Sequence, residues 1–91
     1  MTQITPEVVR QFILEHYVTQ FRALGLEPGQ VPESFDLLLG GVMDSLGVLE
    51  LVGALETRFN CQLDMAGLDA EKMTIIGPLS EYVAANLARK P

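Results

Sequence analysis

Cysteine, histidine and tryptophan are scarce in this sequence, which has one Cys, one His and no Trp in 91 residues. The single cysteine, Cys61, cannot form an internal disulfide, and Cys61 and His16 alone are too few ligands for a zinc site. We therefore predict no metal centre and a buried or half-buried, apolar role for Cys61. His16 is interpreted as a surface or half-buried side chain without a catalytic task.

Long apolar runs are also missing. No stretch reaches the roughly 20 apolar residues of a membrane-spanning helix, and residues 1–5 lack the basic and apolar regions of a signal peptide. These absences predict a cytoplasmic protein without a membrane span. With 48% hydrophobic residues, the chain is long enough for one domain with a modest core, which we place over residues 1–91 and expect to be monomeric.

Basic residues are few where acidic residues gather. From Glu27 to Glu71 the sequence has nine acidic residues and one basic residue, Arg58. This charge repels nucleic acid phosphates and anionic membranes, and it attracts protein partners with basic patches. The acids lack the alternating spacing of a calcium-binding loop.

Strand patterns are absent as well, whereas apolar residues recur at three- and four-residue steps in three segments. The first helix is predicted from about Pro6 to Leu24, with Thr5 as its cap and Gly25 as its stop. The last helix is capped either by Thr74, with a frayed start, which we prefer, or by Gly77, with Pro78 as its first residue. The apolar stripe of the first helix comprises Val9, Ile13, Tyr17, Phe21 and Leu24. Its outward face comprises Gln11, Glu15, Thr19 and Arg22.

A third helix is predicted from Leu46 to Asn60. Its core-facing stripe comprises Val48, Leu51, Val52, Leu55 and Phe59, and its opposite side carries Glu50, Gly53, Thr57 and Asn60. Either Asp44 or Ser45 is the N-cap. Ser45 is therefore expected near the surface at a helix N-terminus, where free N–H groups and the helix dipole favour an anion such as a phosphate ester.

The connections complete an all-α prediction. Pro28-Gly29 and Pro32 should break any regular element between residues 25 and 43, while residues 35–38 form a short helical turn and Gly40-Gly41 free the backbone. The side chains expected to pin this loop are Val31, Phe35, Leu37, Leu38 and Leu39. A short helix is expected within residues 65–72. The result is a small antiparallel four-helix bundle with three long helices, one short helix and a long loop between the first two long helices.

The string Asp44-Ser45-Leu46, followed by Glu50-Leu51-Val52, Leu55-Glu56 and Phe59, resembles the acyl carrier protein family. In that family the serine of the Asp-Ser-Leu motif is esterified with 4′-phosphopantetheine taken from coenzyme A. The resemblance is specific from about Phe35 to Val83, and over the first helix it is one of pattern and length only.

The resemblance implies a carrier rather than an enzyme. Ser45 would hold the phosphopantetheine arm, on which acyl or aminoacyl intermediates are carried as thioesters, and Asp44 would contact the phosphopantetheinyl transferase. The other implied partners are a loading enzyme and downstream biosynthetic enzymes. The expected partner-binding face comprises Leu46, Leu49, Glu50, Gly53 and Glu56. Leu49 either contacts partners or packs under the preceding loop.

The sequence departs from the pattern of carriers in fatty acid synthesis. Those carriers usually have an acid directly after Asp-Ser-Leu, a bulky apolar residue in mid-helix and a run of acids near its end. Here Gly47, Gly53 and Thr57-Arg58 stand at the matching positions. We therefore expect a discrete carrier of a specialised lipid, polyketide or peptide-type pathway, D-alanyl systems included.

A second hypothesis treats the chain as a helical interaction module. In this interpretation the Asp44-Ser45 pair only caps a helix, and the helix binds its partner non-covalently. A hydrolase would need His16 to reach Ser45 from another helix, and nothing in the sequence supports that arrangement. Modification of Ser45 distinguishes the carrier from the interaction module.

Overall fold

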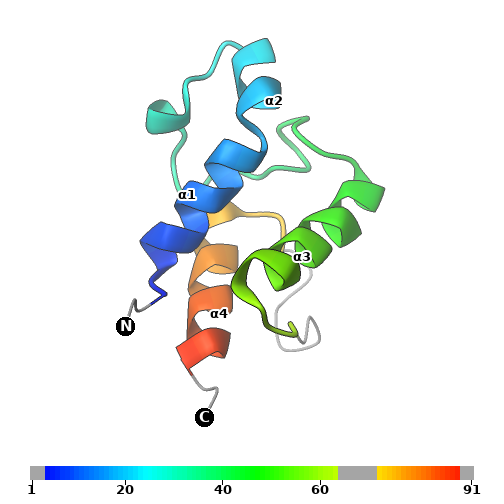
Figure 1. The fold of residues 1–91 in the computed structure, drawn as a ribbon. Coiled ribbons are helices and arrows are strands. Elements are labelled where there is room, and N and C mark those ends of the chain that lie inside the picture. Colours follow the sequence, from blue (N-terminus) through cyan, green and yellow to red (C-terminus); the bar gives the residue numbers. More distant parts are fainter. Residues whose placement is uncertain (1–3, 64–71, 89–91) are drawn as a thin grey trace.

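The computed structural model describes residues 4–63 and 72–88, which form four α-helices (Figure 1). The helices are α1 (Pro6–His16), α2 (Val18–Ala23), α3 (Ser45–Phe59) and α4 (Ile76–Ala88), and a 3-10 helix, η1, spans Pro28–Gln30. Within the described ranges there is no strand, only an isolated β-bridge between Asp36 and Ile75. The all-α prediction is confirmed. The short helix expected within residues 65–72 lies almost wholly outside the described residues.

The helices pack around one core. In Figure 1, α1 and α4 lie side by side and run in opposite directions, while α3 lies obliquely beside them. Phe12 of α1 meets Phe59 of α3 edge to face, with ring centroids 5.8 Å apart. Ile13, Leu55 and Val83 contribute fully buried side chains from all three helices. Within residues 4–63 and 72–88, no helix has the length and apolar character needed to cross a bilayer.

The first long helix is broken at Tyr17. Its start agrees with the prediction, because the Thr5 hydroxyl accepts a hydrogen bond from the Val8 N–H at 3.3 Å. The prediction of one helix over 6–24 was wrong, since Tyr17 leaves the helical region (φ −109°, ψ 21°) and separates α1 from α2. An aromatic residue followed by β-branched Val18 and Thr19 favours a helix only weakly.

The end of α2 is fixed by Gly25, as expected. Gly25 adopts a left-handed conformation (φ 80°), and the Leu26 N–H reaches back to the Phe21 carbonyl at 2.8 Å. This is a Schellman motif, and it satisfies carbonyls that the helix leaves free. Leu24 was expected in the buried stripe but is 49% exposed, because the helix ends at Ala23.

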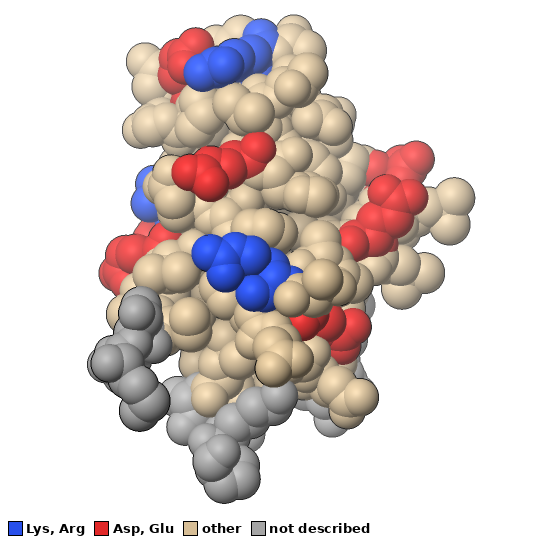
Figure 2. Space-filling model, viewed as in Figure 1, with Lys and Arg blue, Asp and Glu red and all other residues tan. Residues whose placement is uncertain are grey.

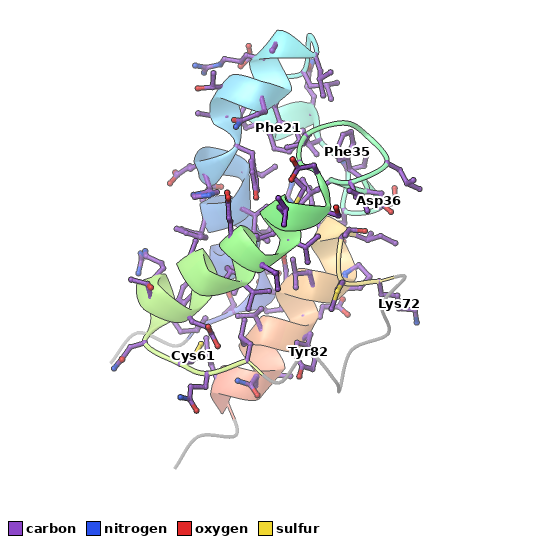
Figure 3. All side chains as sticks on the ribbon, turned by 90° about the vertical axis from the view of Figure 1, so that its right-hand side faces the viewer. Phe21, Phe35, Asp36, Cys61, Lys72 and Tyr82 are labelled. Atoms are coloured by element: carbon purple, nitrogen blue, oxygen red, sulfur yellow. The ribbon has the colours of Figure 1, made fainter. Side chains whose placement is uncertain are left out.

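Two kinds of apolar side chain occupy the loop between α2 and α3. Val31 and Leu37 are buried, and the Phe35 ring lies edge to face on Phe21 at 5.6 Å (Figure 3). Leu38 and Leu39, which were also expected to pin the loop, are 38% and 85% exposed. The prolines were expected to exclude regular structure here, but η1 begins at Pro28, where a fixed φ and a missing N–H are tolerated.

Asp36 explains why Leu38 and Leu39 point outward. Its carboxylate oxygen Oδ1 accepts hydrogen bonds from the N–H groups of both leucines, at 3.0 and 3.1 Å, and so forms a tight turn. The turn begins at Asp36, one residue later than expected. Gly40 is required for space, because a Cβ there would overlap the Phe35 ring, and Gly41 is required for its positive φ of 82°.

Loop carbonyls cap the start of α4. The N–H groups of Ile76 and Gly77 donate to the carbonyls of Phe35 and Glu33, at 3.1 and 2.8 Å. Pro78 is the third residue of the helix, where no intrahelical bond is lost. Neither predicted cap, Thr74 or Gly77, directly precedes the helix, because these long-range hydrogen bonds select Ile76 as its first residue.

The stripe predicted for the central helix is largely confirmed in α3. Leu51, Leu55 and Phe59 are buried, and Val48 and Val52 are half-buried. All four residues assigned to the opposite side are exposed: Glu50, Gly53, Thr57 and Asn60. Cys61, just beyond the helix, is buried as expected.

Replacing two glycines of α3 by alanine should change the stability of the protein in opposite directions. Gly53→Ala should stabilise the protein by about 1 kcal/mol, because no atom lies within 4 Å of the new Cβ and alanine favours a helix. Gly47→Ala should destabilise it by about 1 kcal/mol or more, because the new Cβ would lie 2.9 Å from the Met43 Cβ. Urea denaturation of both variants measures the difference, and equal stabilisation would contradict this packing.

Asp36 should make stability depend on pH. Burial raises the pKa of Asp36. Hydrogen bonds from the Leu39 N–H, the Thr74 hydroxyl and the Leu38 N–H lower it by more than burial raises it, so that the pKa lies below its ordinary 3.8. Because the pKa of Asp36 is lower in the folded state, its charge stabilises the protein at pH values above 3.8. This contribution is lost as the pH falls through the folded-state pKa. At pH 7 the free energy of unfolding of the parent should therefore be about 1 kcal/mol larger than that of Asp36→Asn.

The difference between the two proteins in unfolding free energy should shrink as the pH falls below 3.8, because the Asp36 carboxylate gains its proton as the pH approaches the lowered folded-state pKa. Urea denaturation of the parent and Asp36→Asn at pH 7 and pH 3 measures it. A stability difference that is the same at both pH values would show that the charge of Asp36 does not hold the turn.

Candidate functional site

The backbone of Leu37 directs the chain into α3. Its carbonyl accepts hydrogen bonds from the N–H groups of Val42 and Met43, at 2.9 and 3.1 Å. The side chains of Val42 and Met43 are consequently turned into the core, where they are 5% and 9% exposed. Asp44 and Ser45 follow directly and are exposed, so the chain emerges at the surface just as α3 begins.

Asp44 is the N-cap of α3, which decides between the two residues proposed for that role. Its carboxylate oxygen Oδ1 accepts a hydrogen bond from the Gly47 N–H at 2.8 Å. Ser45 is the first residue of the helix. Its hydroxyl makes no hydrogen bond within the part of the chain that the structure describes, so the oxygen is left available at the surface.

The surroundings of Ser45 can accommodate an anionic ester. N–H groups in the first turn of a helix have no intrahelical acceptor, and the N-terminal end of the dipole is partly positive. The first turn of α3 contains no acidic side chain that would compensate this charge from within the helix. An exposed hydroxyl at this position therefore fits a phosphodiester-linked group.

Acidic side chains gather over the N-terminal half of α3. In Figure 2 they lie at the right-hand edge of the molecule, and no basic side chain is visible beside them. Asp44 and Glu50 are exposed there, and neither forms an ion pair within residues 4–63 and 72–88. A protein that approaches this end of α3 therefore meets a negative surface, which favours a basic partner.

Comparisons with known proteins identify the family. A family model described as "Phosphopantetheine attachment site" matches residues 22–75. An acyl carrier protein from Wolinella succinogenes is 35% identical over 63 residues, which make up 69% of this chain and 80% of that protein. The chain belongs to the acyl carrier protein family. No solved structure matches it.

Membership in the acyl carrier protein family establishes the prosthetic group and the general role. The group is 4′-phosphopantetheine, and the protein is a carrier rather than a catalyst. A phosphopantetheinyl transferase and acyl-handling enzymes are the partners that membership implies. The matched region contains the loop, α3 and the segment that leads into α4.

Four of the five residues predicted to form the partner face of this carrier are exposed on α3. Leu46 and Leu49 are 70% and 72% exposed, and Glu50 and Gly53 are exposed beside them. Leu49 therefore does not pack under the preceding loop, and its contact with partners stays a prediction. Glu56 differs, because it is half-buried and its carboxylate accepts a hydrogen bond from the Leu63 N–H at 2.9 Å.

The structure adds two residues that sequence reasoning did not associate with this site, Tyr17 and Gln20. Both line a hollow beside the start of α3, together with Asp44, Gly47 and Glu50. Tyr17 was predicted only as a core residue, and Gln20 carried no signal. Their placement depends on the break between α1 and α2, which the sequence pattern did not reveal.

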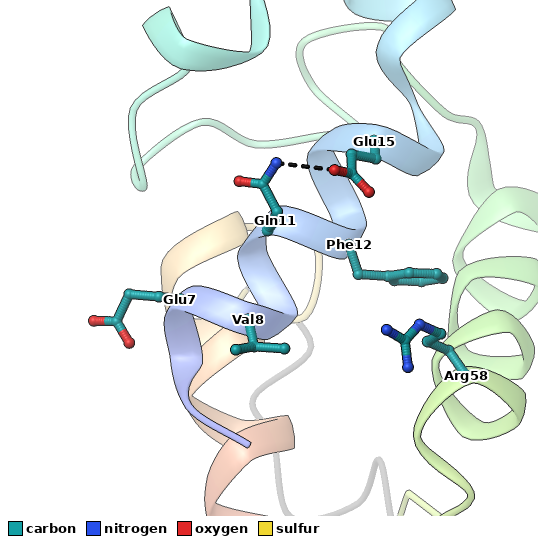
Figure 4. A pocket seen from close by; sticks show the side chains of 6 residues that line it. All are labelled: Glu7, Val8, Gln11, Phe12, Glu15 and Arg58. Atoms are coloured by element: carbon teal, nitrogen blue, oxygen red, sulfur yellow. Dashed lines mark hydrogen bonds between the residues drawn. The ribbon is translucent and has the colours of Figure 1, made fainter. Parts of the chain in front are cut away.

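A second hollow lies between α1 and the C-terminal end of α3, where Arg58 projects opposite the side chains of α1 (Figure 4). Its volume is about 290 Å³, and Gln11 on its rim donates a hydrogen bond to Glu15 at 3.0 Å. Neither Asp44 nor Ser45 lines it, so this hollow is separate from the exposed serine.

The cap at Asp44 should be measurable as stability. Asp44→Ala removes the acceptor of the Gly47 N–H and should destabilise the carrier by about 1 kcal/mol. Asp44→Asn retains an acceptor oxygen and should lose only a few tenths of a kcal/mol from the helix dipole. Thermal unfolding should place Asp44→Ala several degrees below Asp44→Asn, and coincident midpoints would contradict the assigned cap.

Proposed function

We propose that this carrier holds acyl or aminoacyl intermediates as thioesters on a 4′-phosphopantetheine arm attached to Ser45. The observation that supports this most directly is the position of Ser45, an exposed hydroxyl without an internal hydrogen bond at the first residue of α3. The Asp44-Ser45-Leu46 string lies within the region that matches the family.

The chemistry needs no catalytic base on this chain. A transferase positions coenzyme A and a divalent metal ion, and the Ser45 oxygen attacks the phosphorus that bears the pantetheine group. A new P–O bond to serine forms, the pyrophosphate bond of coenzyme A breaks, and adenosine 3′,5′-bisphosphate leaves. The hydroxyl proton passes to the transferase or to solvent. A flexible thiol then carries each intermediate at high effective concentration to successive enzymes.

Asp44 would have two roles in this function. Within the chain it caps α3 and so fixes the backbone at the helix start, where Ser45 is the first residue. Toward the transferase, its exposed carboxylate would contact a basic group. Leu46, Leu49 and Glu50 would then be met by the same approaching surface, since exposed apolar residues beside an acid make a suitable transient contact.

The specialised assignment is supported by Gly47. A side chain at this position would lie 2.9 Å from the Met43 Cβ, so the helix start leaves no room for the acid that fatty acid synthesis carriers usually have here. The smooth surface around Gly53 gives partners a different shape to recognise. We therefore propose a dedicated carrier of a lipid, polyketide or peptide-type pathway.

Intact mass spectrometry tests the proposed function. The parent and Ser45→Ala are incubated with coenzyme A, magnesium and a phosphopantetheinyl transferase of broad specificity. The parent should gain one phosphopantetheine group and Ser45→Ala none, because Ser45 is the exposed hydroxyl residue at the start of α3 and follows the capping Asp44. A folded parent that several transferases leave unmodified would contradict the proposal and favour the non-covalent interaction module.

Asp44→Asn provides the matched control for the role of charge in that assay. It retains a capping oxygen, so the serine stays in place, but it lacks the carboxylate. The modification rate should fall by roughly tenfold or more, because a hydrogen bond to a charged group contributes about 1.5–3 kcal/mol. An unchanged rate would limit Asp44 to its capping role and leave the attachment at Ser45 standing.

A further inference from the structure

The hollow beside Ser45 is formed by segments far apart in the sequence. Tyr17 contributes from the break between α1 and α2, Gln20 from α2, and Asp44, Gly47 and Glu50 from the start of α3. Its volume is about 220 Å³. This is room for a small organic group.

The lining of this hollow is acidic without a compensating base. Two of its residues, Asp44 and Glu50, carry carboxylates, and none is lysine or arginine. Neither carboxylate is paired with a base in the described part of the chain. Burial raises the pKa of the Tyr17 hydroxyl, and the charges of Glu50 and Asp44 raise it further, which indicates that both charges act on this hydroxyl.

The hydroxyl of Tyr17, which also lines this hollow, is only weakly hydrogen-bonded. The residue is only 6% exposed, and within the described residues the sole partner of its hydroxyl is the Met43 Sδ at 3.6 Å. A thioether is a weak acceptor, and no residue in the described ranges donates a hydrogen bond to the phenol oxygen. A buried hydroxyl in this state favours a ligand that can donate to it.

We propose that the hollow binds the ammonium group of an aminoacyl cargo carried on the arm of the same chain. The inference rests on the proposed attachment at Ser45. An ammonium has three N–H donors, and the hollow offers three kinds of acceptor: the Glu50 carboxylate, the Asp44 oxygen that does not bond Gly47, and the Tyr17 hydroxyl. The arm begins between two lining residues, so it can fold back into the hollow.

The charge and hydrogen-bonding groups of the cargo then determine whether it binds in the hollow. An alkyl cargo would remove water from the carboxylates without replacing its hydrogen bonds, and an anionic cargo would be repelled. An ammonium cargo gains charge-assisted hydrogen bonds, and the phosphate on Ser45 would add to the negative potential that attracts it. Because tethering gives an effective concentration of order millimolar, a weak site is sufficient.

Two cargoes that differ only in the ammonium group test this proposal. Coenzyme A analogues in which an amide replaces the thioester are made with an alanyl or a propanoyl group, and a transferase loads each onto the ¹⁵N-labelled protein. Backbone amide shifts should differ between the two loaded forms at Tyr17, Gly47 and Glu50. The difference should be lost in Glu50→Gln and reduced in Tyr17→Phe, and it should persist in Glu81→Gln, whose exposed acid on α4 does not line the hollow.

Each outcome of this experiment decides a different point. A parent that accepts neither analogue overturns the proposed attachment and this inference together. A loaded parent in which the alanyl and propanoyl forms have the same shifts around the hollow overturns the inference alone. A shift difference that survives in both Glu50→Gln and Tyr17→Phe also overturns it, because the ammonium would then lie elsewhere.

Discussion

The structure depends on one anchored residue, Leu37. Its side chain is fully buried, its N–H donates to the Thr74 carbonyl at 2.8 Å, and its carbonyl accepts from Val42 and Met43. A single residue thus ties the long loop to the segment before α4 and to the segment before α3. The carbonyls of Glu33 and Phe35 hold the earlier part of the loop against α4, but only beyond Leu37 is the chain directed into α3.

The site follows from that anchor. Once Val42 and Met43 turn inward, the next two residues emerge at the surface, where Asp44 caps α3 and Ser45 begins it. The scaffold supplies rigidity behind the serine and leaves the space in front of it open. This division suits a carrier, because the group it bears must be held at a fixed base and yet reach several enzymes.

Much of this arrangement could be predicted from local sequence. The apolar repeat of α3, the cap region at residues 44 and 45 and the stop at Gly25 are short-range signals with a direct physical cause. Leu38 and Leu39 were misplaced because the Asp36 turn reverses the direction of their side chains. The start of α4 and the hollow at Tyr17 depend on contacts between distant segments, which a periodic pattern does not contain.

The most direct test of the account is to locate the phosphopantetheine group on the modified chain by fragmenting its peptides in a tandem mass spectrometer. The account predicts that the whole added mass is on Ser45. An added mass on another exposed hydroxyl, such as Ser34 or Thr57, with Ser45 unmodified would contradict it, because neither residue begins a helix.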